Sequence, residues 1–168
     1  MSLPAPLAGN LTVLEQGRTL LTELSDDLYA GAGLERGSVG AQYRHVLDHY
    51  GSLLGGLASG LVDYDARERE PLLEASRAAA DERTGFLCDA LGRLSGADLS
   101  RPLRVHLAAS ANEAEAEPWP SSLGRELLFV VSHTVHHFAI IRLLLAERGH
   151  SCAAEFGVAP STLAFRAR

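Results

Sequence analysis

Cysteine and aromatic residues are scarce in this sequence, and its basic residues form no cluster. The two cysteines of the 168-residue chain, Cys88 and Cys152, provide neither a disulfide framework nor a cysteine metal motif, which favours a reducing cytoplasm. Aromatic residues make up 6% and hydrophobic residues 46% of the chain, a composition typical of packed helices rather than of disorder. Fifteen basic and 21 acidic residues leave a net charge of -6, and the basic residues are scattered. We therefore expect no nucleic-acid partner.

Targeting signals and several common catalytic motifs are also missing. Met1–Asn10 contains two prolines and no basic residue, so we expect neither a secretory signal nor a transit peptide. There is no glycine-rich phosphate loop, no G-x-S-x-G elbow and no C-x-x-C pair. Leu127–Ala146 is nearly long enough to span a bilayer, but three histidines and an arginine interrupt it. We interpret this stretch as a buried core helix and expect no membrane partner.

Four segments show the spacing of amphipathic helices, and the length of the chain fits one domain, residues 1–168. Prolines, glycines and capping serines predict the limits of these helices. The first runs from Leu7 to Tyr29 and stops before Gly31 and Gly33, the second from Ser38 to the Asp63–Asp65 turn, the third from Pro71 to Leu94, and the fourth from Ser121 or Ser122 to Arg148. Leu103–Leu107 alternates like a short strand, and a polar run at Asn112–Glu117 follows. The sequence thus predicts an all-α four-helix bundle. Its long crossover between the third and fourth helices could close one end.

Five of the seven histidines fall in two short clusters. His45 and His49 are four residues apart on the second predicted helix, and His133 and His137 are four apart on the fourth. Residues at this spacing project from one helix face, so each helix can offer two imidazoles to one point. On the fourth helix this face is apolar and should point inward, where a metal ion would satisfy converging imidazoles. The alternative is that these are ordinary core histidines bonded to backbone carbonyls.

The remaining histidines and the neighbouring acidic residues carry weaker signals. We expect His106, His136 and His150 to be exposed or bonded to the backbone. Asp48 and Glu126 either orient metal ligands or are solvated charges. The fourth helix has threonine where a zinc-protease H-E-x-x-H motif has glutamate, and the chain does not carry the two E-x-x-H motifs that di-iron proteins use. These absences argue against both of those chemistries.

The sequence resembles the DinB/YfiT-like superfamily of four-helix bundles with a three-histidine metal site. The resemblance extends over most of the chain, at Gly37–His45, Asp63–Arg69, Ser121–Leu127, Ser132–His137 and Phe156–Thr162. It implies that the ligands are His45, His133 and His137. In that reading His49 either completes a four-histidine site or accepts a hydrogen bond beside an open position. Some members of the superfamily look like transferases or isomerases that use low-molecular-weight thiols such as bacillithiol or mycothiol.

Three neutral imidazoles would leave a divalent ion its full charge and an open coordination position, as in catalytic sites. The leading hypothesis is a metal-dependent transferase or hydrolase that acts on a small-molecule substrate with a thiol or water as nucleophile. Zinc and nickel are the first expectations, and iron also suits imidazole ligands. Arg67, Arg69 and Arg125 could recognise an anionic substrate, and the alternative is that they are exposed arginines without such a role. The alternatives are a non-catalytic metal-binding or stress-related bundle and a purely structural bundle, and the long helices would allow a homodimer.

Overall fold

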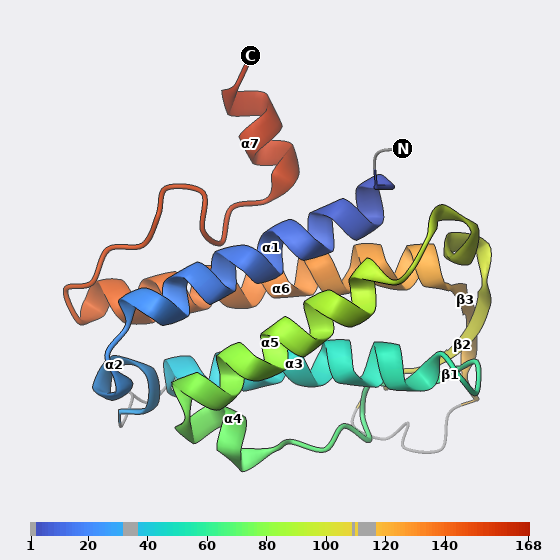
Figure 1. Ribbon diagram of the computed structural model, residues 1–168, viewed down its shortest axis with the longest axis horizontal. Coiled ribbons are helices and arrows are strands. Elements are labelled where there is room, and N and C mark those ends of the chain that lie inside the picture. The colour runs from blue at the N-terminus through green and yellow to red at the C-terminus, as the bar shows by residue number, and fades with distance from the viewer. Residues whose placement is uncertain (1–2, 32–36, 109, 111–116) are drawn as a thin grey trace.

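Four long helices form the body of the protein in a computed structural model that describes residues 3–31, 37–108, 110 and 117–168. They are α1 (Ala5–Glu23), α3 (Val39–Gly56), α5 (Arg77–Gly92) and α6 (Leu123–Glu147). Helices α1 and α3 each pack against both α5 and α6. Figure 1 shows α1 and α6 running in one direction and α3 and α5 in the other. The predicted all-α bundle is confirmed, with a small sheet added at one end.

Two of the predicted helices are each divided in two. The expected helix from Leu7 to Tyr29 is wrong, because Leu24 is extended and Ser25 caps a separate helix, α2 (Asp26–Ala30), by accepting a hydrogen bond from the Leu28 amide. The third predicted helix also breaks at an extended residue, Ser76, between α4 (Pro71–Ala75) and α5. A serine cap inside an apolar periodic run marks both boundaries. The predicted stop at Gly33 lies outside the described residues.

The second predicted helix begins where expected and ends early. Ser38 caps α3 by accepting a hydrogen bond from the Ala41 amide at 3.0 Å. The helix ends at Gly56, and Leu61–Asp63 forms a strand, β1, rather than more helix. The chain turns sharply here, since a Cβ on Gly56 would lie 2.4 Å from the Leu61 carbonyl oxygen and Gly60 has a φ of +77°. Glycine is the residue that tolerates both conditions.

The long connection between α5 and α6 builds a three-stranded sheet at one end of the bundle (Figure 1). After a short 3₁₀ helix, η1 (Gly96–Ser100), strand β2 (Pro102–His106) pairs in parallel with β1 and antiparallel with β3 (Trp119–Ser122). The strand expected near Leu103–Leu107 is therefore confirmed. The polar run at Asn112–Glu117 lies outside the described residues except for Glu117. The sheet fixes the segment after α3 against the segment before α6.

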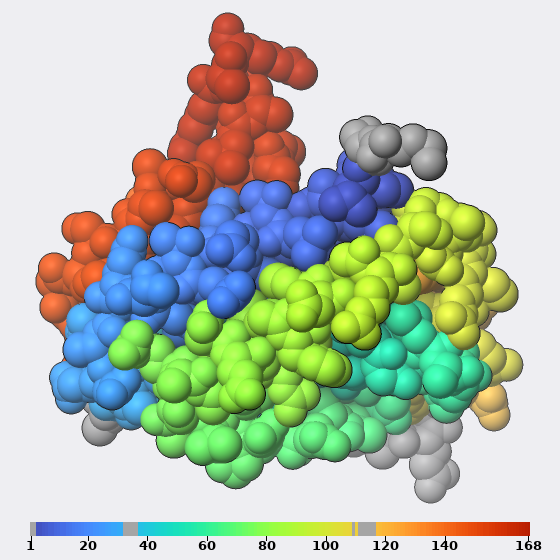
Figure 2. All heavy atoms as spheres, viewed as in Figure 1, coloured from blue at the N-terminus to red at the C-terminus, as the bar shows by residue number. Residues whose placement is uncertain are grey.

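Helix α6 is the central rod of the bundle. Ser122 caps its first turn, as predicted, and its buried face packs against α1 and α3. Within the described ranges it is a helix long and apolar enough to cross a membrane by length and composition alone. After α6 the chain folds back, and Phe156 stacks on Phe138 with ring centroids 4.6 Å apart. The final helix, α7 (Pro160–Arg166), was not expected from the sequence, and Figure 2 shows it standing away from the bundle.

Candidate metal centre

The four predicted histidines meet where α3 packs against α6. The Nε2 atom of His133 lies 3.2 Å from the Nε2 atom of His45 and 3.2 Å from that of His137. The helices run antiparallel at this contact, so one turn of α3 faces one turn of α6. The structure thus brings together side chains that are 88 residues apart in the sequence.

His49 belongs to the same cluster and is almost completely buried, with 4% of its surface exposed. Its ring centroid is 3.9 Å from that of His133, and ligand atoms of His45, His49 and His133 all lie within 4.8 Å of one another. The Nδ1 atom of His49 donates a hydrogen bond to the His45 carbonyl oxygen at 2.8 Å. The proton on Nδ1 leaves the Nε2 lone pair of His49 free.

Gln42 orients His137 and is a site residue that the sequence did not predict. Its Oε1 atom accepts a hydrogen bond from the Nδ1 of His137 at 2.7 Å. Such a bond fixes the ring and leaves Nε2 unprotonated, which is the usual arrangement around a metal-binding histidine. The available signal was spacing, because positions 42, 45 and 49 share one face of α3.

The electrostatics of the cluster favour neutral imidazoles. Burial, reinforced by the neighbouring histidines, lowers the pKa of His45 to about 3, of His133 to about 2 and of His137 to about 4. Burial also lowers the pKa of His49. At neutral pH the cluster therefore presents unprotonated nitrogens, the form that binds metals.

The geometry of the cluster fits a metal ion. Two nitrogens bound to one tetrahedral ion at about 2.1 Å lie roughly 3.4 Å apart. The contacts of His133 with His45 and His137 are 3.2 Å. If His133 carries its proton on Nδ1, its Nε2 lone pair faces the Nε2 atoms of His45 and His137, and a cation between them can bind all three. The donor set is therefore suited to a divalent metal.

Aromatic side chains wall one side of the cluster. The buried ring of Tyr64 stacks on His49 with centroids 5.4 Å apart, and the Phe129 ring lies 5.7 Å from that of His133. The Tyr64 hydroxyl donates to the Oε2 of Glu126 at 2.9 Å, and Glu126 is fully buried. Arg125 lies 5.5 Å over the Phe129 ring and also donates to Glu126. Glu126 thus holds Tyr64 in place, and among the described residues it forms no hydrogen bond with a histidine.

The other residues considered from the sequence lie outside the cluster. His136 is exposed, and its ring meets the His137 ring edge-on at 5.2 Å. The carboxylate of Asp48 pairs with Arg44 at 2.8 Å instead of orienting a histidine. The Nδ1 atom of His106 lies 3.5 Å from carboxylates of both Asp63 and Asp65, a second group that could hold a cation. Both carboxylates already accept backbone hydrogen bonds, from Ala66 and Ala108 among others.

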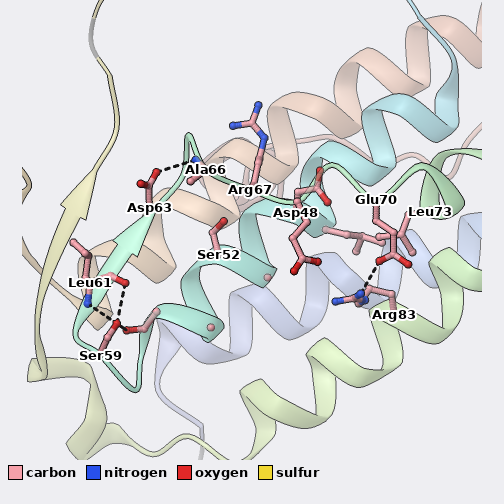
Figure 3. A pocket seen from close by; sticks show the side chains of 15 residues that line it. Asp48, Ser52, Ser59, Leu61, Asp63, Ala66, Arg67, Glu70, Leu73 and Arg83 are labelled. Carbon is pink, nitrogen blue, oxygen red and sulfur yellow. Dashed lines mark hydrogen bonds and ion pairs between the residues drawn. The ribbon is translucent and has the colours of Figure 1, made fainter. Parts of the chain in front are cut away.

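A cavity of about 410 Å³ lies next to the segment that follows β1 (Figure 3). None of the clustered histidines lines it. Its charged lining consists of four acidic residues and two arginines: Asp48, Asp63, Glu68, Glu70, Arg67 and Arg83. Arg83 and Glu70 form an ion pair at 2.7 Å within it. The cavity therefore shares no lining residue with the histidine cluster, and unlike the cluster its charged lining is mostly acidic.

Four long helices with a histidine cluster between α3 and α6 define a helical-bundle protein with a candidate metal centre. The family model of the DinB superfamily matches residues 13–141, a range that includes all four histidines. The chain belongs to the DinB superfamily, and the resemblance seen in its sequence is confirmed. Members of this superfamily generally bind metal ions.

Two individual proteins are similar to the chain. A crystal structure of YjoA, a DinB-like protein from Bacillus subtilis, superimposes with a TM-score of 0.58 at 18% identity, covering 88% of this chain and 94% of that one. This likeness shows a shared fold. A Rhizopus delemar protein named FK506-binding protein 5 is 35% identical over 103 residues, which are 61% of this chain and 27% of that protein. The chain thus matches only about a quarter of the length of this curated relative.

Proposed function

We propose that this protein binds one divalent metal ion through His45, His133 and His137 and works as a transferase or hydrolase. The observation that carries the proposal is the convergence of three Nε2 atoms, with His133 3.2 Å from both of its neighbours. An all-imidazole set leaves the charge of the ion unneutralised, which is typical of catalytic sites. When bound, the metal would supply Lewis acidity that favours the anionic form of a thiol or of water as nucleophile.

The chain's own residues would prepare the site. Gln42 holds the tautomer of His137 through the 2.7 Å hydrogen bond, and Tyr64 fixes the ring plane of His49 by stacking. Phe129 limits the access of water from its side. Burial raises the pKa of both Cys88 and Cys152, and neither belongs to the cluster, so a reactive thiol would come from a cosubstrate. A low-molecular-weight thiol is the cosubstrate we propose.

Zinc and nickel are the metals we propose first, with iron as an alternative, because imidazole suits all three. The test is elemental analysis of protein purified without an affinity tag, followed by cobalt(II) substitution. A visible spectrum of four-coordinate cobalt(II) that changes when a thiol is added would support an exchangeable position. Absence of any bound metal would overturn the proposal.

A second candidate is a non-catalytic metal-binding or stress-related bundle in which His49 is a fourth ligand. The observation in its favour is the position of His49, whose ligand nitrogen lies within 4.8 Å of those of His45 and His133. A saturated site would bind metal without an exchangeable water. The variants His49→Ala and His137→Ala separate the two candidates: the enzyme proposal expects loss of metal binding in His137→Ala alone, whereas a four-histidine site expects weakening in both.

A cytoplasmic location and a homodimer are further proposals that follow from the sequence. The reasoning rests on the two free cysteines and on the long apolar helices. Cell fractionation tests the location. Light scattering coupled to size-exclusion chromatography tests the dimer, and a mass near 17.9 kDa would contradict it.

A further inference from the structure

Arg67 is a half-buried cation held by the backbone on the segment between β1 and α4. One terminal nitrogen of its guanidinium donates a hydrogen bond to the Tyr64 carbonyl oxygen at 2.5 Å. Its Nε atom is buried and has no hydrogen-bond partner among the described residues. In the same part of the chain, no carboxylate forms an ion pair with it within 4.0 Å. A buried donor without a partner is destabilising, which indicates that a ligand completes this group.

The charge of Arg67 acts on the histidine cluster. Burial is the main cause of the low pKa values there, and the positive charge of Arg67 lowers those of His45, His49 and His137 further. In Figure 3 the guanidinium points away from the carboxylates of Asp48 and Glu70, with which it shares the cavity wall. Arg67 is also joined to the cluster through Tyr64, whose carbonyl oxygen holds the guanidinium and whose ring stacks on His49.

Nearby carboxylates are already engaged by other groups. Glu126 accepts hydrogen bonds from Tyr64, Ser121 and Arg125. Asp48 is bound to Arg44 at 2.8 Å. Neutral histidines would leave the charge of a divalent ion uncompensated, and Arg67, which has no ion pair within 4.0 Å among the described residues, adds a further positive charge. Such a region attracts an anion.

We propose that Arg67 binds a carboxylate of the substrate or cosubstrate, and that the metal centre is therefore selective for small anionic molecules. The inference rests on the proposed metal-binding function. Guanidinium suits this task because its planar donors match the two oxygens of a carboxylate. The free Nε and the remaining terminal nitrogen form one edge of that plane, and the bond to Tyr64 holds the group in position. Arg67 is a specificity-determining residue in this scheme.

The test compares two thiols of similar length on the cobalt(II)-loaded protein, 3-mercaptopropionate and 3-mercapto-1-propanol. The thiolate-to-cobalt absorption band reports binding of each and gives a Kd. A charge-assisted hydrogen bond predicts that the wild type binds the carboxylate thiol about tenfold more tightly or better. Arg67→Gln should lose this preference, measured as the ratio of the two Kd values, because that ratio cancels any general effect of the Arg67 charge on thiolate binding. Binding of one equivalent of cobalt(II) by Arg67→Gln shows that the site is intact. Arg69→Gln is the matched control, because Arg69 is exposed and lies two residues away.

Each outcome decides the matter. Loss of the preference in Arg67→Gln, with retention in Arg69→Gln, supports the inference. An unchanged preference in Arg67→Gln, or no preference in the wild type, overturns the role of Arg67 and leaves the metal site standing. If no cobalt(II) binds, or if neither thiol perturbs bound cobalt(II), the proposed function fails and the inference falls with it.

Discussion

His133 is the residue whose removal tests the metal centre most directly. Its Nε2 atom lies 3.2 Å from two other imidazole nitrogens, so His133→Ala removes the shared neighbour of the cluster. A metal present at 100 times its Kd stabilises the folded state by about 2.7 kcal/mol. In a chain of this size each kcal/mol raises Tm by about 2–4 °C. We therefore expect EDTA to lower the Tm of the wild type by about 5–11 °C, and one equivalent of metal to restore it.

Differential scanning calorimetry with and without EDTA measures this effect. His133→Ala should melt at the same temperature in both conditions, because it no longer holds the metal. His136→Ala is the control, since that side chain is exposed on the outer face of the same helix, and it should behave like the wild type. An equal EDTA effect in His133→Ala and in the wild type would refute the reasoning and move the metal elsewhere.

Three further predictions concern stability. Gly40→Ala should destabilise the fold by about 1–3 kcal/mol in urea melts, because its Cβ would lie 2.1 Å from the Glu74 carbonyl oxygen. Gly51→Ala, with open space around it, should stabilise α3 by about 0.5–1 kcal/mol. Equal effects of the two substitutions would contradict the packing. Tyr50→Phe should cost about 1–3 kcal/mol, because it removes the buried 2.6 Å hydrogen bond to Asn10, and an unchanged urea midpoint would argue against that bond. Without metal, the free energy of unfolding should fall as the pH drops from about 6.5 toward 4. In this range the histidines of the unfolded chain bind protons, whereas a buried histidine such as His137, with a pKa of about 4, stays neutral in the folded protein. His137→Gln should reduce that fall in urea melts, and an identical pH profile would contradict it.

The sequence predicted the bundle and the histidine cluster because both depend on local spacing. Leucines at helical intervals mark the apolar faces. Two i, i+4 histidine pairs on such faces must point into the interior wherever the helices pack. The metal ligands themselves remain a prediction, since proximity alone does not distinguish His49 from His137.

Other parts of the structure were not predicted, most of them because they depend on long-range contacts. Tyr64 reaches His49 because β1 pairs with β2, and the sequence shows neither that pairing nor its register. Gln42 becomes relevant when α6 places His137 opposite it. The breaks at Leu24 and Ser76 follow from serine caps within periodic runs, a local signal that the apolar spacing concealed.

The pairing of β1 with β2 also has a consequence for the order of folding. It joins Leu61 to Arg104, and the cluster itself joins positions 88 residues apart, so both require the closure of long loops. Contacts of this range tend to form late, after helices such as α3 have begun to appear. A metal that recognises the assembled cluster would then have little to bind in the folding transition state. We expect bound metal to lower the unfolding rate while leaving the folding rate nearly unchanged. The ion would then increase the kinetic stability of the folded bundle.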